Sequence, residues 1–144
     1  MPDDPASVTL VRRIEWMDTD ASGVYHWSTV FRLVEAAEAV LHDRLGIREH
    51  TFGRTPRVHV SCDYRRELAF YDTVRTVLTV AEVGRSSVRY DFSVYPGEET
   101  EPAAEGEVVA VHVTEAPGGG ADPWPPEIRE WLLGGGDQGV VEGA

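Results

Sequence analysis

Residues 28–45, which read STVFRLVEAAEAVLHDRL, decide the fold. Apolar side chains recur there at steps of three and four residues, as they do along one face of a helix. The members of this apolar stripe are Val30, Leu33, Val34, Ala37, Leu41 and Leu45. Further small or apolar residues lie off the stripe, and Gly46 follows as a typical helix end. The pattern predicts a central helix that the rest of the chain wraps on several sides.

The segments around this helix have the alternating pattern of strands. One such run precedes the helix and four follow it: residues 8–16, 58–68, 74–83, 88–95 and 107–114. Gly84, Arg85 and Ser86 separate two of the runs and indicate a hairpin. Residues 125–133 begin with two prolines and predict a short last helix. The order predicts an α+β fold, one antiparallel five-stranded sheet wrapped around the long central helix.

The ends of the chain differ in composition from the middle. Residues 1–7 are rich in proline and aspartate, and residues 134–144 are rich in glycine. We therefore expect one domain over residues 8–133, with flexible termini on both sides. A length of 144 residues suits a single domain with its own hydrophobic core.

The charge and the residue counts exclude several classes of protein. Twenty-five acidic residues against 13 basic ones give a net charge of -12, which disfavours nucleic acids and anionic membrane surfaces as partners. Every basic residue is Arg, and neither Lys nor Asn occurs, so Schiff-base lysines, P-loops and Cys-His-Asn triads are excluded. Cys62 is the one cysteine, and no stretch has the length and apolar character of a signal peptide or membrane span. We expect a cytoplasmic protein.

Residues 18–23, which read Asp-Thr-Asp-Ala-Ser-Gly, form a turn before the helix. They match the start of an EF-hand loop, but the twelfth position of that loop would be Thr29 rather than the required Glu. The five histidines also lack the spacing of metal ligands, so no metal is expected. Asp20 would lie close to the free amides of the helix start. These amides would stabilise the oxygen of a bound acyl group, while the Asp20 carboxylate attacks the acyl carbonyl or activates a water. The alternative is that Asp18 or Asp20 only forms an Asx turn.

Three further polar residues on or before the helix are candidates. Glu35 lies beside the apolar stripe, and a buried carboxylate there is either a structural ion pair with an Arg or a second catalytic group. Glu38, one turn later, is expected to be solvated or at an interface. His26 follows the turn and is expected to be a pocket wall or a general base.

The turn 18–23, a helix beginning about five residues later, and Glu35 resemble the hot-dog fold acyl-CoA thioesterases of the 4-hydroxybenzoyl-CoA thioesterase family. Residues 61–68, 71–74 and 83–88 are similar to the second strand, the next turn and the third hairpin of that family. The resemblance spans about residues 9–133. It implies a hot-dog fold, hydrolysis of acyl-CoA or carrier-bound acyl thioesters without metal or cofactor, and a homodimer or homotetramer with active sites at subunit boundaries.

The resemblance also assigns site residues. It places the catalytic nucleophile or general base on Asp20 and the carbonyl-polarising backbone amide at Trp27, with Glu35 as a second acidic candidate. Many relatives read Gly-Val-Val-Tyr-His after the turn, whereas this chain has Gly-Val-Tyr-His-Trp at 23–27, so His26 takes the place of their Tyr. We expect Tyr25 and His26 to line the substrate pocket and Trp27 to narrow it.

An anionic CoA must be held by local Arg residues in so acidic a chain. Arg65, Arg66 and Arg85, with Ser86, are the candidates for contacts to phosphate or pantetheine. The alternative is that these are ordinary surface Arg residues balancing nearby Glu. Carrier proteins are usually acidic and would meet the same repulsion, which favours CoA.

Two other functions fit the same resemblance. A hot-dog dehydratase or hydratase would act on β-hydroxyacyl or enoyl thioesters and would use a His such as His26. A non-catalytic acyl-thioester-binding protein would keep the fold without turnover. The fold alone does not separate these alternatives, because function resides in the site.

Overall fold

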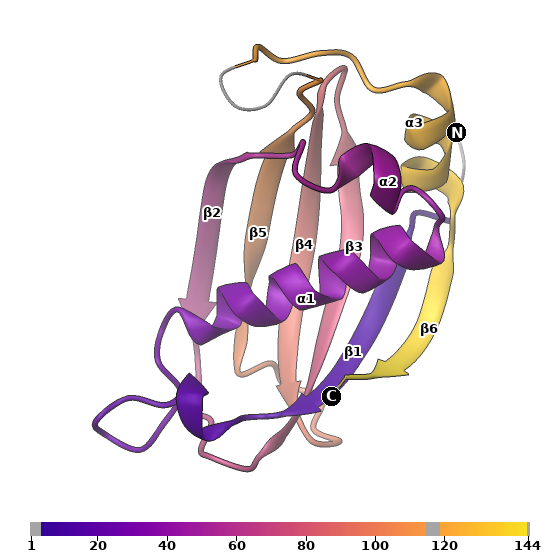
Figure 1. The fold of residues 1–144 in the computed structure, drawn as a ribbon. Helices are drawn as coiled ribbons and strands as arrows, with labels where there is room; N and C mark the ends of the chain where they lie inside the picture. The colour runs from indigo at the N-terminus through magenta and orange to yellow at the C-terminus, as the bar shows by residue number, and fades with distance from the viewer. Residues whose placement is uncertain (1–3, 115–118, 144) are drawn as a thin grey trace.

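The computed structural model describes residues 4–114 and 119–143 and shows one curved sheet with a long helix across one face (Figure 1). In chain order the elements are β1 Ser7–Arg13, a 3₁₀ turn Trp16–Asp18, α1 Thr29–Arg44, α2 Arg48–Thr51, β2 Arg57–Tyr64, β3 Thr73–Val83, β4 Ser87–Pro96, β5 Ala104–Val111, α3 Pro126–Gly134 and β6 Asp137–Glu142. The predicted α+β class and the long helix are confirmed.

The strands form one sheet in the order β2-β5-β4-β3-β1-β6. The pairs from β2 to β1 are antiparallel, and β3 and β4 form the predicted hairpin, closed where the amide of Gly84 donates to the carbonyl of Ser87 at 2.8 Å. β1 and β6 are parallel. The sheet therefore has β2 at one edge and β6 at the other.

The sixth strand corrects the sequence analysis, which predicted five strands and assigned residues 134–144 to a flexible terminus. β6 lies inside that segment and places Val141 opposite Leu10 of β1. Its glycines gave the segment a loop-like composition, but Gly136 and Gly139 have φ of +76° and +87°, which glycine adopts readily. Gly136 lies in the turn before β6, and Gly139 lies where the pairing of β6 with β1 shifts register.

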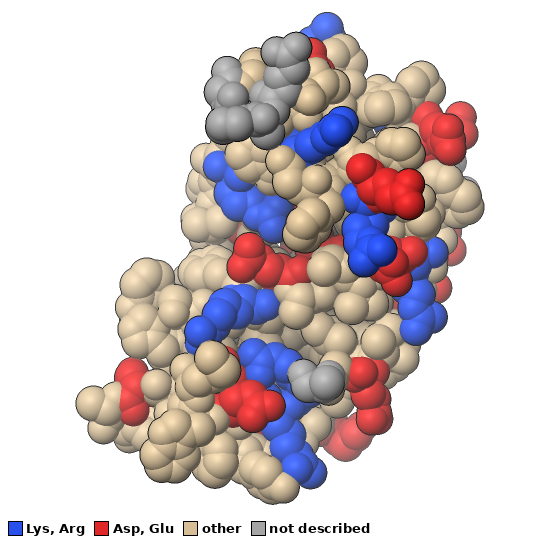
Figure 2. Space-filling view, in the orientation of Figure 1, with Lys and Arg blue, Asp and Glu red and all other residues tan. Residues whose placement is uncertain are grey.

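Helix α1 buries the predicted apolar stripe against the sheet. Leu33, Ala37 and Leu41 are fully buried, and α1 approaches β1 and β3 most closely. The helix leaves the outer part of β2 uncovered, so Val58 and Val60 are 62% and 47% exposed. Acidic and basic side chains are interspersed on this face of the molecule (Figure 2). None of the helices in the described part of the chain has the length and apolar character that a bilayer span requires.

A glycine of β5 allows β2 to approach. A Cβ added at Gly106 would lie 2.0 Å from the backbone oxygen of Ser61 in β2. Replacing Gly106 by alanine should therefore push β2 away from β5 and lower the free energy of unfolding by about 3 kcal/mol. Chemical denaturation followed by circular dichroism measures this loss.

Gly120 provides the matched control, because a Cβ added there meets no atom of a described residue within 4 Å. Gly120→Ala should leave the unfolding midpoint close to that of the wild type. A Gly106→Ala protein as stable as the control would contradict the close approach.

Candidate functional site

The turn before α1 is anchored by a buried carboxylate, that of Asp18, which is 2% exposed. Asp18 accepts a hydrogen bond from Arg12 of β1 at 2.9 Å, one from Arg32 of α1 at 3.1 Å and one from the amide of Glu15 at 2.7 Å. Burial alone would raise the pKa of Asp18, but the hydrogen bonds of Arg12 and Glu15 and the charges of Arg12 and Arg32 together lower it. Asp18 is therefore an ionised structural anchor.

The backbone of Asp18 also fixes the entry to the helix. Its carbonyl oxygen accepts hydrogen bonds from the amide of His26 and from the hydroxyl of Thr29, each at 2.7 Å. The sequence analysis considered only an Asx turn for Asp18. The missed signal was the presence of two Arg residues, on the preceding strand and the following helix, that could reach one carboxylate.

Asp20 lies on the exposed part of the same turn. One carboxylate oxygen accepts hydrogen bonds from the amide of Ser22, at 2.8 Å, and from the Ser22 hydroxyl, which is the Asx-turn geometry considered as the alternative. The Ser22 hydroxyl is the main cause that lowers the pKa of Asp20. Gly23, with φ of +85°, closes the turn. Asp20 is thus an exposed and ionised carboxylate.

A surface hollow of about 390 Å³ lies beside Asp20. Its lining comes from the turn, the segment that leads into α1, the end of β2 and the residues that follow β2: Asp20, Val24, Tyr25, Trp27, Tyr64, Arg65, Arg66 and Glu67. The structure therefore brings together five residues that the sequence analysis selected for one site, Asp20, Tyr25, Trp27, Arg65 and Arg66. We call this space the Asp20 hollow.

The start of α1 borders the Asp20 hollow. The backbone amide of Trp27 donates to no other described residue, while its carbonyl accepts a hydrogen bond from the hydroxyl of Tyr64. The Nδ1 atom of His26 accepts from the amide of Ser28 at 3.1 Å, so His26 caps the helix start and does not line the hollow. The Trp27 amide remains available to a ligand.

Three wall residues, Tyr25, Arg65 and Arg66, have defined hydrogen-bond or ion-pair partners. The hydroxyl of Tyr25 donates to the carbonyl of Arg66 at 3.1 Å, and burial raises the pKa of Tyr25 to about 12. Arg65 pairs with Glu105 at 2.7 Å, and Arg66 pairs with Glu99. About half of each Arg side chain is exposed, so both guanidinium groups border the hollow with an acidic neighbour.

Arg85 and Ser86 lie at the opposite end of the sheet, in the β3–β4 turn (Figure 1). The carbonyl of Arg85 accepts from the amide of Trp124 at 2.9 Å, and that of Ser86 accepts from the amide of His112 at 2.7 Å. Within one protomer, the structure does not bring these two residues to the Asp20 hollow.

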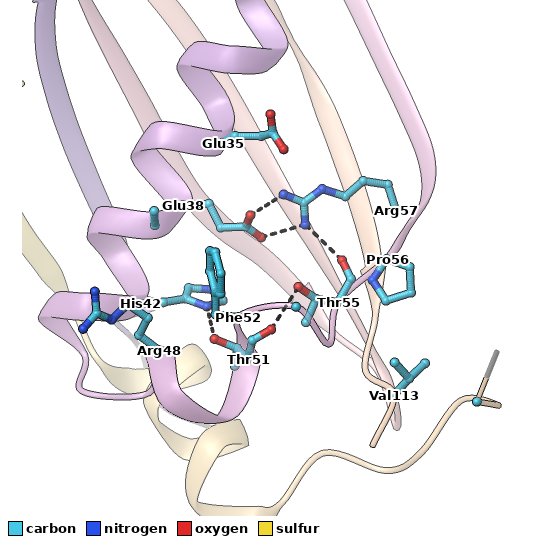
Figure 3. A pocket seen from close by; sticks show the side chains of 13 residues that line it. Glu35, Glu38, His42, Arg48, Thr51, Phe52, Thr55, Pro56, Arg57 and Val113 are labelled. Carbon is cyan, nitrogen blue, oxygen red and sulfur yellow. Dashed lines mark hydrogen bonds and ion pairs between the residues drawn. The ribbon is translucent and has the colours of Figure 1, made fainter. Parts of the chain in front are cut away.

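A second cavity, of about 580 Å³, lies between the C-terminal half of α1 and the segment that leads into β2 (Figure 3). Glu35 lines this cavity rather than the Asp20 hollow, and it is exposed. Of Glu35 and Glu38, it is Glu38 that pairs with an Arg, at 3.0 Å from Arg57. The expectation that Glu38 is solvated is therefore corrected: its side chain is 12% exposed, because Arg57 closes over it. We call this space the Arg57 cavity.

A buried polar pair supports the floor of the Arg57 cavity. The two ring nitrogens of His42 lie 2.6 Å from the hydroxyl of Thr51 and 2.7 Å from that of Tyr90. Burial lowers the pKa of His42 and raises that of Tyr90. Both side chains are therefore neutral at pH 7. In the described residues, no three His, Cys, Asp or Glu side chains are placed to hold a metal ion.

The sequence profile of the thioesterase-like superfamily matches residues 14–132, a range that contains both the Asp20 hollow and the Arg57 cavity. The chain belongs to the thioesterase-like superfamily. This membership makes the protein a hydrolase that acts on thioester bonds. A search of curated proteins finds no significant match.

Solved structures similar to this superfamily member confirm the hot-dog fold. An Asp-to-Asn mutant of 4-hydroxybenzoyl-CoA thioesterase, complexed with 4-hydroxybenzoyl-CoA, has a TM-score of 0.79 at 19% identity over 88% of this chain and 99% of that chain. A 1,4-dihydroxy-2-naphthoyl-CoA thioesterase from Synechocystis has a TM-score of 0.77 at 18% identity over 88% and 95% of the two chains. A Pseudomonas aeruginosa protein has a TM-score of 0.76 at 28% identity over 86% and 87%.

The anchoring role of Asp18 can be tested by Asp18→Asn. Loss of this buried charge should lower the free energy of unfolding by about 3 kcal/mol at pH 7, because Arg12 is left without its partner. Since the folded-state pKa of Asp18 lies below its ordinary value of 3.8, the stability it adds is present above that value and is lost as the pH falls through the lowered pKa. Urea unfolding from pH 7 down to pH 3 measures both effects.

Asp20→Asn is the matched control for stability, because Asp20 is exposed and bonds only within its own turn. It should leave the urea midpoint almost unchanged. Equal destabilisation by the two substitutions would show that Asp18 is not the anchor.

Proposed function

We propose that this protein hydrolyses acyl-CoA thioesters at the Asp20 hollow, with Asp20 as nucleophile or general base. One observation carries the proposal: the ionised Asp20 and Trp27, whose backbone amide donates to no described residue, line the same hollow. Neither group alone would suggest a site. Together they are the two parts that thioester hydrolysis requires, a base or nucleophile and a donor for the acyl oxygen.

The Trp27 amide would act on the carbonyl oxygen. As Asp20 or an activated water attacks the thioester carbon, negative charge develops on that oxygen. The amide and the positive end of the dipole of α1, a helix of 16 residues, would stabilise this charge. The lowered pKa of Asp20 keeps its carboxylate ionised and able to attack or to accept a proton.

Coenzyme A is the proposed carrier of the acyl group. The names of two similar solved structures specify CoA thioesters of hydroxylated aromatic acids. Arg65 and Arg66 border the Asp20 hollow and can bind CoA phosphate or the polar pantetheine arm, in exchange with Glu105 and Glu99. Arg85 and Ser86 would reach CoA only from another subunit.

A second copy of the chain is the proposed partner of the open edge of the sheet. β2 pairs with β5 on one side only, and no described strand pairs with its other side. Its Val58 and Val60 side chains are exposed because α1 does not cover them. An edge of this kind pairs readily with another strand. A two-fold axis would place two β2 strands antiparallel in a homodimer, and two such dimers can form a tetramer.

The catalytic role of Asp20 is tested by free-thiol release from a panel of aromatic and aliphatic acyl-CoAs. Asp20→Asn should lower kcat/KM by about 10²–10⁴, the cost of losing a positioned base or nucleophile. Unfolding measurements on the same samples show whether the protein stays folded. If Asp20→Asn keeps the wild-type kcat/KM, another residue is the nucleophile or base. If the wild type changes the enoyl absorbance of a substrate without releasing thiol, the protein is a hydratase.

The role of β2 in assembly is tested by Val60→Glu. A carboxylate in the middle of the pairing edge should give a monomer in light scattering at micromolar concentration, with little hydrolysis left. Val140→Glu is the matched control, because Val140 is 68% exposed on β6 at the other edge of the sheet. If Val60→Glu stays dimeric and Val140→Glu does not, the interface lies at the β6 edge and the proposed pairing of β2 strands is wrong.

A further inference from the structure

The turn that carries Asp20 is held by its backbone on both sides. The amide of Asp20 donates to the carbonyl of Val24 at 2.9 Å, and the amide of Gly23 donates to the carbonyl of Asp20 at 3.0 Å. Thr19 and Tyr25 pair across the base of the turn as an isolated antiparallel bridge. The backbone of Asp20 therefore has a fixed place, and only rotation about its side-chain bonds could move the carboxylate.

Ser22 restrains this last freedom of Asp20. Its backbone amide and its side-chain hydroxyl both donate to Oδ1 of Asp20, the amide at 2.8 Å. No described residue donates to Oδ2, the other carboxylate oxygen. A hydroxyl that donates to a carboxylate makes a strong, charge-assisted hydrogen bond. The two bonds therefore fix which oxygen is occupied and which one remains for a substrate.

The Ser22 hydroxyl would influence hydrolysis in two opposite ways. Ser22 does not line the Asp20 hollow, so within one protomer its influence on a substrate there passes through Asp20. The hydroxyl orients the carboxylate, and a misplaced reacting group slows a reaction strongly. The same bond lowers the pKa of Asp20, and a carboxylate of lower pKa is a weaker base and nucleophile. Orientation therefore speeds the reaction at neutral pH, whereas the lowered pKa slows it.

Other charged or titratable groups also lie around Asp20. The charge of His26, which follows the turn, lowers the pKa of Asp20 as well, but less than the Ser22 hydroxyl does. The walls of the Asp20 hollow contribute Tyr25, Tyr64, Arg65, Arg66 and Glu67. All of these groups stay in place when only Ser22 is replaced. A changed pH dependence in a Ser22 variant would therefore report the loss of the serine hydroxyl.

We infer that Ser22 is a positioning residue of the hydrolysis reaction. Its hydroxyl holds Oδ1 of Asp20, so that Oδ2 is the oxygen that serves as nucleophile or general base. The orienting effect of the hydroxyl outweighs the weaker basicity that the same hydroxyl causes. The inference rests on the proposed hydrolase function, and it adds a residue that acts on the substrate only through Asp20.

Ser22→Ala tests the orienting effect, because it removes the hydroxyl and keeps the amide bond that forms the turn. The assay is free-thiol release from the acyl-CoA that the wild type cleaves fastest. At pH 7, kcat should fall about tenfold with KM little changed, because the substrate does not contact Ser22. Ser22→Thr keeps a hydroxyl and should restore most of the rate. A wild-type kcat in Ser22→Ala would overturn the inference, even though the protein is a hydrolase.

The pH dependence separates the two effects of the hydroxyl. In Ser22→Ala the pKa of Asp20 rises toward its ordinary value of 3.8, so the acid limb of kcat/KM should move to higher pH. An NMR titration of the Asp20 carboxylate carbon, identified by its loss in Asp20→Asn, should show the same direction without turnover. An unmoved limb and titration would show that the hydroxyl does not hold the carboxylate. A faster reaction at pH 7 would show that basicity dominates. Either result would overturn the inference.

Thr114 provides a matched control away from the Asp20 hollow. Its amide donates to Oδ2 of Asp122 at 3.1 Å, and its hydroxyl donates to the same oxygen, as Ser22 does to Asp20. The Thr114 hydroxyl is also the main cause that lowers the pKa of Asp122. Thr114 follows β5 at the end of the sheet that holds Ser86. Thr114→Ala should therefore keep the wild-type kcat and pH dependence, and an equal loss there would overturn the inference.

A double variant shows whether Ser22 acts only through Asp20. In the Asp20→Asn background the hydroxyl has no carboxylate to orient, so adding Ser22→Ala should change the remaining kcat by no more than about twofold. A tenfold loss in both backgrounds would mean that Ser22 acts independently and would overturn the inference. Ser22 is exposed, so each variant should keep the wild-type urea midpoint. A wild type that cleaves no acyl-CoA would instead contradict the proposed hydrolase function itself.

Discussion

The buried ion pairs of Asp18 are the interaction on which the rest of the site depends. They join Arg12 at the end of β1 to Arg32 in α1, while the Asp18 carbonyl holds His26 and Thr29 at the helix entry. The exposed turn can therefore project a second carboxylate, that of Asp20, at a fixed place relative to the Trp27 amide. Two aspartates two residues apart thus have different surroundings: Asp18 is buried and serves as the anchor, and Asp20 is exposed and is the proposed catalytic carboxylate.

Arginine performs this kind of task throughout the molecule. All 13 Lys and Arg positions are Arg, so each of these groups stays protonated and can offer several donors to a carboxylate. Arg57 with Glu38 and Arg65 with Glu105 repeat the pairing seen at Asp18. In a chain with a net charge of -12, Arg57 at one end of β2 and Arg65 just past the other end each hold a carboxylate.

The sequence was sufficient for the elements whose pattern is local. The three- and four-residue period predicted α1, and alternation predicted the strands up to β5. The resemblance and the charge argument together selected the five residues that the structure brings to one hollow. Features that depend on distant contacts were missed. β6 requires β1, more than 120 residues earlier, as its partner; the roles of Asp18 and Glu38 require particular Arg residues to reach them; and the register shift of β2 at Val58 requires β5 beside it.

The two edges of the sheet differ, and in the proposed assembly this difference would limit how many copies the sheet can join. β6 is short, carries glycine at 139 with φ of +87° and shifts register against β1, so it offers a poor template for another strand. Addition at one edge only, by the same surface on both copies, closes on itself and leaves no site for growth. In the proposed dimer, the glycine-rich C-terminal segment would therefore end the sheet on each side, so that the sheet does not extend to further copies.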